Sequence, residues 1–161
     1  MLGYIHLQKR RHDQAIAKAQ RGIALDPNWA DGYVFLAQIL RWMGRGEESV
    51  KLVQKAMRLN PRYPAFYQSI LGFSHCSTGQ YPEAIAEQKG ALSRNANLLI
   101  SHVCLAACFS MAGRDKEARA QVQEVLRLSP NYSLSAVGGG PWKNPADGKP
   151  MIDALRKAGL K

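Results

Sequence analysis

Residues 71–92 read LGFSHCSTGQYPEAIAEQKGAL, and this stretch decides the fold because its parts recur along the chain. It opens with a leucine and a small residue, has a glycine near its middle, and carries a further small residue five positions after that glycine. Such recurrence at a fixed period is the mark of a repeat architecture, in which each unit packs against its neighbours. The leucines are Leu2, Leu36, Leu71 and Leu105, separated by 34, 35 and 34 residues.

Two further series of positions show the same three offsets. Small side chains at fixed places let two helices approach closely, and glycine between helices permits the positive φ of a sharp reversal. Proline at the end of a unit stops one helical hairpin and starts the next helix. The small series is Ala15, Ser49, Ala84 and Ala118, the turn series is Arg10, Gly44, Gly79 and Gly113, and the prolines are Pro27, Pro61 and Pro130.

These patterns predict an all-α fold, because no segment alternates with the two-residue period of a half-buried strand. Each hairpin has two apolar faces and must stack on its neighbours, which gives an α-solenoid of about four hairpins plus a C-terminal capping helix. We expect the solenoid over residues 1–130 with an incomplete first repeat, a Gly/Pro-rich linker over 131–148, and the capping helix over 149–161. Helices are expected over 1–8, 12–25, 29–43, 46–59, 64–77, 81–94, 98–112 and 115–128.

The repeats resemble tetratricopeptide repeats (TPRs) over residues 1 to about 130, and this resemblance implies a right-handed α-solenoid. The match is best at Leu71-Gly72, Gly79-Gln80-Tyr81, Glu83-Ala84-Ile85 and Ala91-Leu92, whereas Ala96 replaces the closing proline of the third repeat. The resemblance implies a non-catalytic interaction module whose concave wall, formed by the first helix of each hairpin, binds a peptide, a partner helix or a second copy of the chain. The implied wall residues are Val34, Gln38, Arg41, Trp42, Phe66, Ser69, Phe73, Ile100, Val103 and Ala107.

The implied wall is mostly apolar, and two alternatives stay open for its aromatic side chains. They either bind a partner segment or pack within the stack beneath the chain's own C-terminal end, where Trp142 follows the flexible Gly138–Gly140 and could fold back. The Lys, Asn and Arg pattern of the carboxylate-clamp version of the family is absent, which argues against an acidic chaperone tail as the partner. The incomplete first repeat leaves pairing of two chains as a third alternative.

Composition narrows the remaining functions. The net charge of +10 would suit an acidic partner, but no nucleic-acid-reading module is visible, so we expect no nucleic-acid binding. No apolar run is long enough to span a bilayer, and an odd number of cysteines fits a reducing compartment, so a cytoplasmic location is expected. We expect no catalytic residue, no cofactor and no metal, and interpret Cys76, Cys104 and Cys108 as small packing residues.

The end of the chain carries a second resemblance. Lys143-Asn144-Pro145-Ala146-Asp147, followed by Asp153-Ala154-Leu155-Arg156-Lys157-Ala158-Gly159-Leu160, is similar to the C-terminus of bacterial multidomain proteins. In these, TPRs follow a class III adenylate/guanylate cyclase domain or a winged-helix regulatory domain. The alternative function is therefore the C-terminal regulatory TPR region of a cyclase or transcriptional regulator, with the catalytic residues lying elsewhere.

Overall fold

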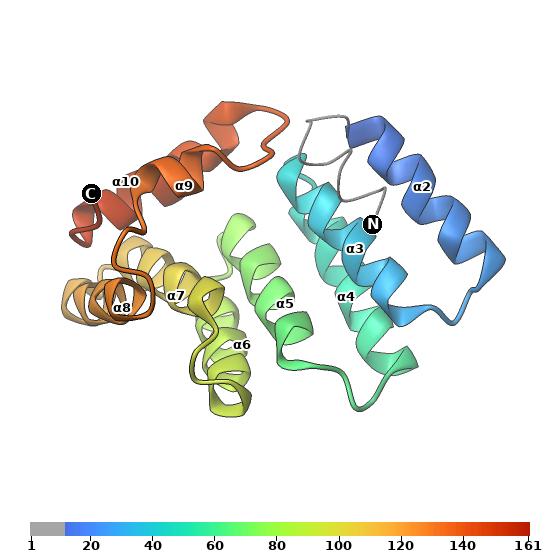
Figure 1. Cartoon of the computed structure of the whole chain (residues 1–161), viewed down its shortest axis with the longest axis horizontal. Coiled ribbons are helices and arrows are strands. Elements are labelled where there is room, and N and C mark those ends of the chain that lie inside the picture. Colours follow the sequence, from blue (N-terminus) through green and yellow to red (C-terminus); the bar gives the residue numbers. More distant parts are fainter. Residues whose placement is uncertain (1–11) are drawn as a thin grey trace.

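The computed structural model describes residues 12–161, and within this range the protein is entirely helical (Figure 1). The helix expected over 1–8 and the basic cluster Lys9-Arg10-Arg11 lie outside the described residues. The elements are α2 (His12–Leu25), α3 (Ala30–Trp42), α4 (Gly46–Leu59), α5 (Ala65–Ser77), α6 (Tyr81–Arg94), α7 (Leu99–Met111), α8 (Asp115–Leu128), α9 (Leu134–Gly138), the 3₁₀ helix η1 (Pro145–Gly148) and α10 (Lys149–Lys157).

The helices of the repeats begin and end within one residue of the predicted ranges. The turns inside the hairpins explain this agreement, because the glycine of each turn adopts a left-handed conformation that other residues avoid. The φ angles are 77° at Gly44, 78° at Gly79 and 74° at Gly113. The turn function assigned to these three glycines is therefore confirmed.

The small-residue positions lie where two helices meet. Ala15, Ser49, Ala84 and Ala118 are all fully buried, as the close approach of packed helices requires. Gly72 shows how tight the contact is, because a Cβ there would lie 2.7 Å from Nε2 of Gln88 on α6. The repeat therefore has a small residue wherever two helices pack closely.

The core consists of three apolar clusters in sequence along the stack. One joins α2, α3 and α4, the next joins α3, α4 and α5, and the largest joins α5 to α8 with α9 and α10. Each hairpin therefore buries its apolar faces against its neighbours, which is the packing of a solenoid. The predicted fold class is confirmed.

The C-terminal segment, residues 131–161, does not continue the stack. A next repeat would pack against α8, whereas α10 packs mainly against α7. In Figure 1 the chain runs from α8 through α9 toward the first hairpins and then turns back, so that α10 ends on the side of α7 and α8. Residues 131–148, which were expected to form a Gly/Pro-rich linker, contain α9 and η1. Val137 and Trp142 in this region are buried, so it packs against the rest of the protein. Pro150 lies in the first turn of α10, and Leu155 on the same helix is fully buried.

Candidate partner-binding wall

The first helices of the hairpins, α3, α5 and α7, lie next to one another and form the inner wall of the stack. All ten residues expected to bind a partner are on these three helices, but they differ in exposure. Phe66 and Ile100 are exposed, and Gln38 and Trp42 are half-buried. The buried ones are Val34, Arg41, Ser69, Phe73, Val103 and Ala107.

Phe66 and Ile100 mark the open half of the inner wall, near the N-terminal ends of α5 and α7. They are 34 residues apart and so occupy equivalent places in successive repeats, with 40% and 42% of their surfaces exposed. One turn further along, Ser69 is held inside the stack. Its hydroxyl accepts a hydrogen bond of 3.0 Å from Ser101, and its carbonyl accepts one of 2.8 Å from Gln88 Nε2.

The C-terminal segment covers the other half of the inner wall, at the C-terminal ends of α3 and α5. Trp142 packs edge-on against Trp42 and is only 5% exposed. The backbone amide of Lys143 donates a 2.9 Å hydrogen bond to the Trp42 carbonyl. His12 Nε2 donates one of 2.6 Å to the carbonyl of Pro141, so the segment also reaches α2.

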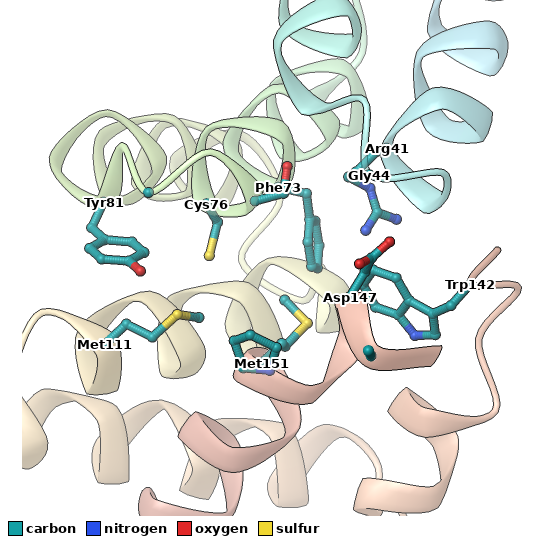
Figure 2. Close-up of a pocket in the computed structure, with 13 residues that line it drawn as sticks. Arg41, Gly44, Phe73, Cys76, Tyr81, Met111, Trp142, Asp147 and Met151 are labelled. Carbon is teal, nitrogen blue, oxygen red and sulfur yellow. The ribbon is translucent and has the colours of Figure 1, made fainter. Parts of the chain in front are cut away.

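A cavity of about 380 Å³ lies between this segment and the inner wall. Figure 2 shows side chains from both sides meeting there. The inner wall contributes Arg41, Phe73, Cys76, Ser77 and Met111, and the first residue of α6 contributes Tyr81. The C-terminal segment contributes Trp142, Ala146, Asp147, Pro150 and Met151, and two turns contribute Gly44 and Gly79.

Two charged residues, Arg41 and Asp147, line this cavity, and Arg41 is only 5% exposed. The guanidinium carbon lies 4.0 Å from the centre of the Trp42 ring and 4.9 Å from that of Phe73, so the charge is held by aromatic faces. Nε has no hydrogen-bond partner among the described residues. Burial lowers the pKa of Arg41 from 12.5 to about 10, which leaves it charged at neutral pH.

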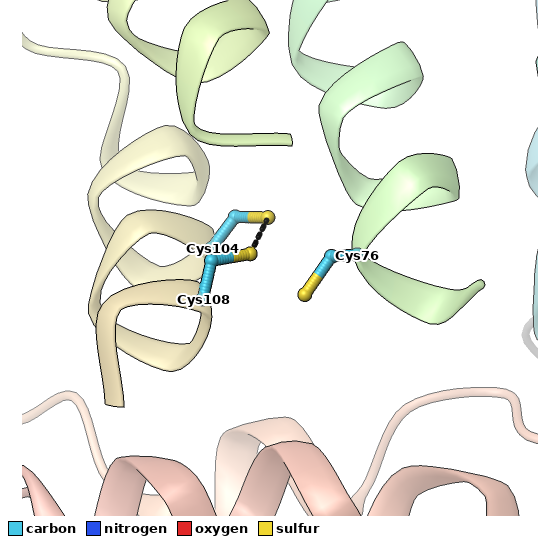
Figure 3. A group of neighbouring side chains, drawn as sticks. All are labelled: Cys76, Cys104 and Cys108. Atoms are coloured by element: carbon cyan, nitrogen blue, oxygen red, sulfur yellow. Dashed lines mark hydrogen bonds between the residues drawn. The ribbon is translucent and has the colours of Figure 1, made fainter. Parts of the chain in front are cut away.

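Three thiols meet just behind the cavity (Figure 3). The Sγ atoms of Cys76, Cys104 and Cys108 all lie within 4.8 Å of one another, and those of Cys104 and Cys108 are 3.8 Å apart. Hydrogen bonds from the other two thiols lower the pKa of Cys76, whereas burial raises the pKa of Cys104. All three side chains are buried, as their interpretation as packing residues implies, but they pack against each other.

Sequence reasoning placed Arg41 on the wall but left out Cys76, which lines the same cavity. The signal was present, because Cys76 follows Arg41 by 35 residues and so occupies the equivalent place in the next repeat. The contributions of Met151 and Asp147 could not have been found in this way, because the C-terminal segment does not share the repeat register.

Comparison with known proteins gives the fold but no specific identity. No family model matches the sequence. Superkiller protein 3 of Saccharomyces cerevisiae is 33% identical over 85 residues, which are 53% of this chain and 6% of that protein, so the chain spans a small part of its relative.

Two solved structures share the whole architecture. TTC0263, a thermophilic TPR protein of Thermus thermophilus, superposes with a TM-score of 0.72 at 22% identity, covering 96% of this chain and 78% of that one. YrrB, described as a TPR protein with an unusual peptide-binding site, gives a TM-score of 0.63 at 18% identity, covering 97% of this chain and 80% of that one. The fold is therefore that of a TPR solenoid.

Membrane insertion through a helix has no support in the described residues. None of the helices between residues 12 and 161 combines the length and the apolar character that crossing a bilayer requires.

Proposed function

We propose that the chain is a non-catalytic TPR interaction module that binds an extended peptide along the open half of its inner wall. The observation that carries this proposal is the exposure of Phe66 and Ile100 at equivalent places on neighbouring inner helices. Two large apolar side chains repeated along a wall can each receive one apolar side chain of an extended ligand. Burial of apolar surface contributes about 25 cal/mol per Å².

The covered half of the wall supports the choice of the open half as the binding surface. Trp42, Arg41 and Phe73 already contact Trp142 or each other, so a ligand would have to displace the C-terminal segment to reach them. Phe66 and Ile100 require no such displacement. The peptide-binding site for which YrrB is described is consistent with a ligand of this class on the same fold.

A peptide library displayed on phage and selected against the full chain tests this proposal. We expect enrichment of sequences with two apolar residues, and loss of binding of a synthetic selected peptide in Phe66→Asp and Ile100→Asp. Leu25→Asp is the matched control, because Leu25 is 81% exposed at the end of α2, outside the inner wall. Equal affinity in all four proteins, at unchanged helical circular dichroism, would exclude this surface.

The alternative, a C-terminal regulatory TPR region of an adenylate/guanylate cyclase or a transcriptional regulator, stays a prediction from the resemblance of residues 143–160. A cyclase or winged-helix domain encoded in the same reading frame upstream would support it. The cytoplasmic location, the pairing of two chains and the lack of nucleic-acid binding also stay predictions. Sedimentation velocity and a low-salt mobility-shift assay test the last two.

A further inference from the structure

The three thiols come from two neighbouring inner helices and form one compact donor set. Cys104 and Cys108 are four residues apart and share a face of α7, and Cys76 reaches them from α5. Three thiolates around one ion lie about 4 Å apart if each metal–sulfur bond is about 2.3 Å long, as in zinc thiolates. The sulfur atoms here lie within 4.8 Å of one another, so small side-chain rotations suffice to close the set.

The three sulfur ligands favour Cu(I) over Zn²⁺. Sulfur ligands favour soft ions such as Cu(I), whereas structural zinc sites are almost always four-coordinate. Within residues 12–161 the cluster consists of the three cysteines alone, without an imidazole or a carboxylate that would supply a fourth ligand. Three sulfur atoms in a buried site match the low coordination number that Cu(I) accepts.

The surroundings supply the charge that such a complex needs. Three thiolates and one Cu(I) carry a net charge of −2, which is costly in an apolar interior unless a cation lies near. Arg41 is the cation of this cavity, because it is buried, lines the cavity together with Cys76 and is in none of the ion pairs among the described residues. The Asp147 carboxylate lines the same cavity, so Arg41 offsets only part of the negative charge.

The cavity provides a route to the thiols. Cys76 lines it together with the thioethers of Met111 and Met151, which Figure 2 shows on the inner wall and on α10. Thioethers are soft ligands that hold Cu(I) weakly. An ion that enters beneath the C-terminal segment therefore meets sulfur donors before it reaches the buried thiols.

We propose that Cys76, Cys104 and Cys108 bind one Cu(I) ion as three thiolates, with Arg41 balancing part of the charge. Three S–H protons are released to solvent, three Cu–S bonds form, and copper remains Cu(I), so no oxidant or reductant is consumed. The site joins α5 to α7 and lies under the C-terminal segment, so copper would cross-link two repeats from within.

The test is a titration of the reduced full chain with Cu(I) under anaerobic conditions, in competition with the chelator bathocuproine disulfonate. We expect one equivalent to be retained and X-ray absorption to show three sulfur atoms without nitrogen or oxygen around copper. Replacing any one cysteine with serine removes a ligand and should weaken copper binding by at least about 100-fold. Arg41→Met should weaken it by about 10-fold, because the loss of a group that supports metal ligands costs about 10- to 100-fold in affinity.

The control is Ser110→Ala on α7, which leaves all three thiols and removes a buried hydroxyl that has no hydrogen-bond partner within residues 12–161. It should bind copper as the unchanged chain does. Failure of the unchanged chain to retain copper against the chelator would overturn the proposal, as would unchanged affinity in Cys76→Ser. A nitrogen or oxygen ligand in the absorption spectrum, or preference for Zn²⁺, would overturn the three-sulfur Cu(I) assignment.

Discussion

The indole of Trp142 lies edge-on against the indole of Trp42, with ring centroids 4.4 Å apart and an angle of 80° between the planes. Edge-to-face pairs of this kind stabilise by about 0.5–1.5 kcal/mol beyond the area that they bury. The contact joins residues that are 100 positions apart in sequence and closes the C-terminal segment over one half of the inner wall. The proposed peptide site is therefore the other half, where Phe66 and Ile100 are exposed.

Replacing Trp142 with alanine should release the C-terminal segment. We expect a loss of about 3 kcal/mol in the free energy of unfolding, at the lower end for a buried tryptophan. Amide hydrogen exchange should rise over residues 134–160. Trp29→Ala is the matched control, because Trp29 is 40% exposed and lies between α2 and α3. Unchanged exchange in the C-terminal segment of the Trp142 variant would show that this residue does not hold it.

Gly148 should not tolerate a side chain, because a Cβ there would lie 2.7 Å from the Trp142 ring. We expect Gly148→Ala to lose about 1–3 kcal/mol of stability through overpacking, measured by urea denaturation. Gly138→Ala is the control, since the nearest atom to its added Cβ is the Ile152 side chain at 3.5 Å, an ordinary contact. Equal stability of the two variants would place Trp142 elsewhere.

Arg41 should be replaceable by methionine but not by alanine. Because folding lowers its pKa to about 10, the cost of burying the charge is fully present below pH 10 and fades as the pH rises toward 12.5. Arg41→Met removes this cost, keeps most of the packing, and should change stability by less than about 1.5 kcal/mol at pH 7. Arg41→Ala leaves a cavity and should lose about 2–4 kcal/mol. Thermal denaturation of both variants measures the difference, and a larger loss in the methionine variant would contradict it.

Substitution of a turn glycine should lower the stability of the protein through backbone conformation alone. Gly113 has φ of +74°, and apart from its chain neighbours no atom of residues 12–161 lies within 4 Å of the place that a Cβ would occupy, so Gly113→Ala meets strain but no collision. We expect a loss of about 1–2 kcal/mol. Gly113→Asn should lose less, because asparagine enters the left-handed region more readily. Denaturant titration of the two variants decides, and an asparagine variant less stable than the alanine variant would refute the conformational explanation.

The repeat helices could be predicted to within a residue because period, small side chains and turn glycines all point to the same hairpins. Leu36, Leu71 and Leu105 are buried where the period requires, and Gly44, Gly79 and Gly113 turn the chain as expected. A fold of this kind can be predicted from sequence because several independent local features indicate the same structure.

The surface proposed for binding is harder to predict from sequence, because the exposure of the wall residues depends on segments outside the repeat. Phe66 and Phe73 are seven residues apart on α5, and both were expected on the partner-binding wall. In the structure Phe73 is buried beside Arg41, whereas Phe66 is exposed. The position of Trp142 decides which part of the wall is covered, and folding back was one of two alternatives that the sequence left open. The meeting of Cys76 with Cys104 and Cys108 depends on how α5 and α7 rotate against each other, which composition alone does not give.

The most direct measurement is nuclear magnetic resonance mapping of a selected peptide on the isotopically labelled chain. Peptide binding on the inner wall should shift signals of Phe66, Ile100 and their neighbours on α5 and α7, while those of Trp142 and α10 stay in place. Shifts confined to the outer helices α4, α6 and α8, with Phe66 and Ile100 unaffected, would contradict binding at the inner wall.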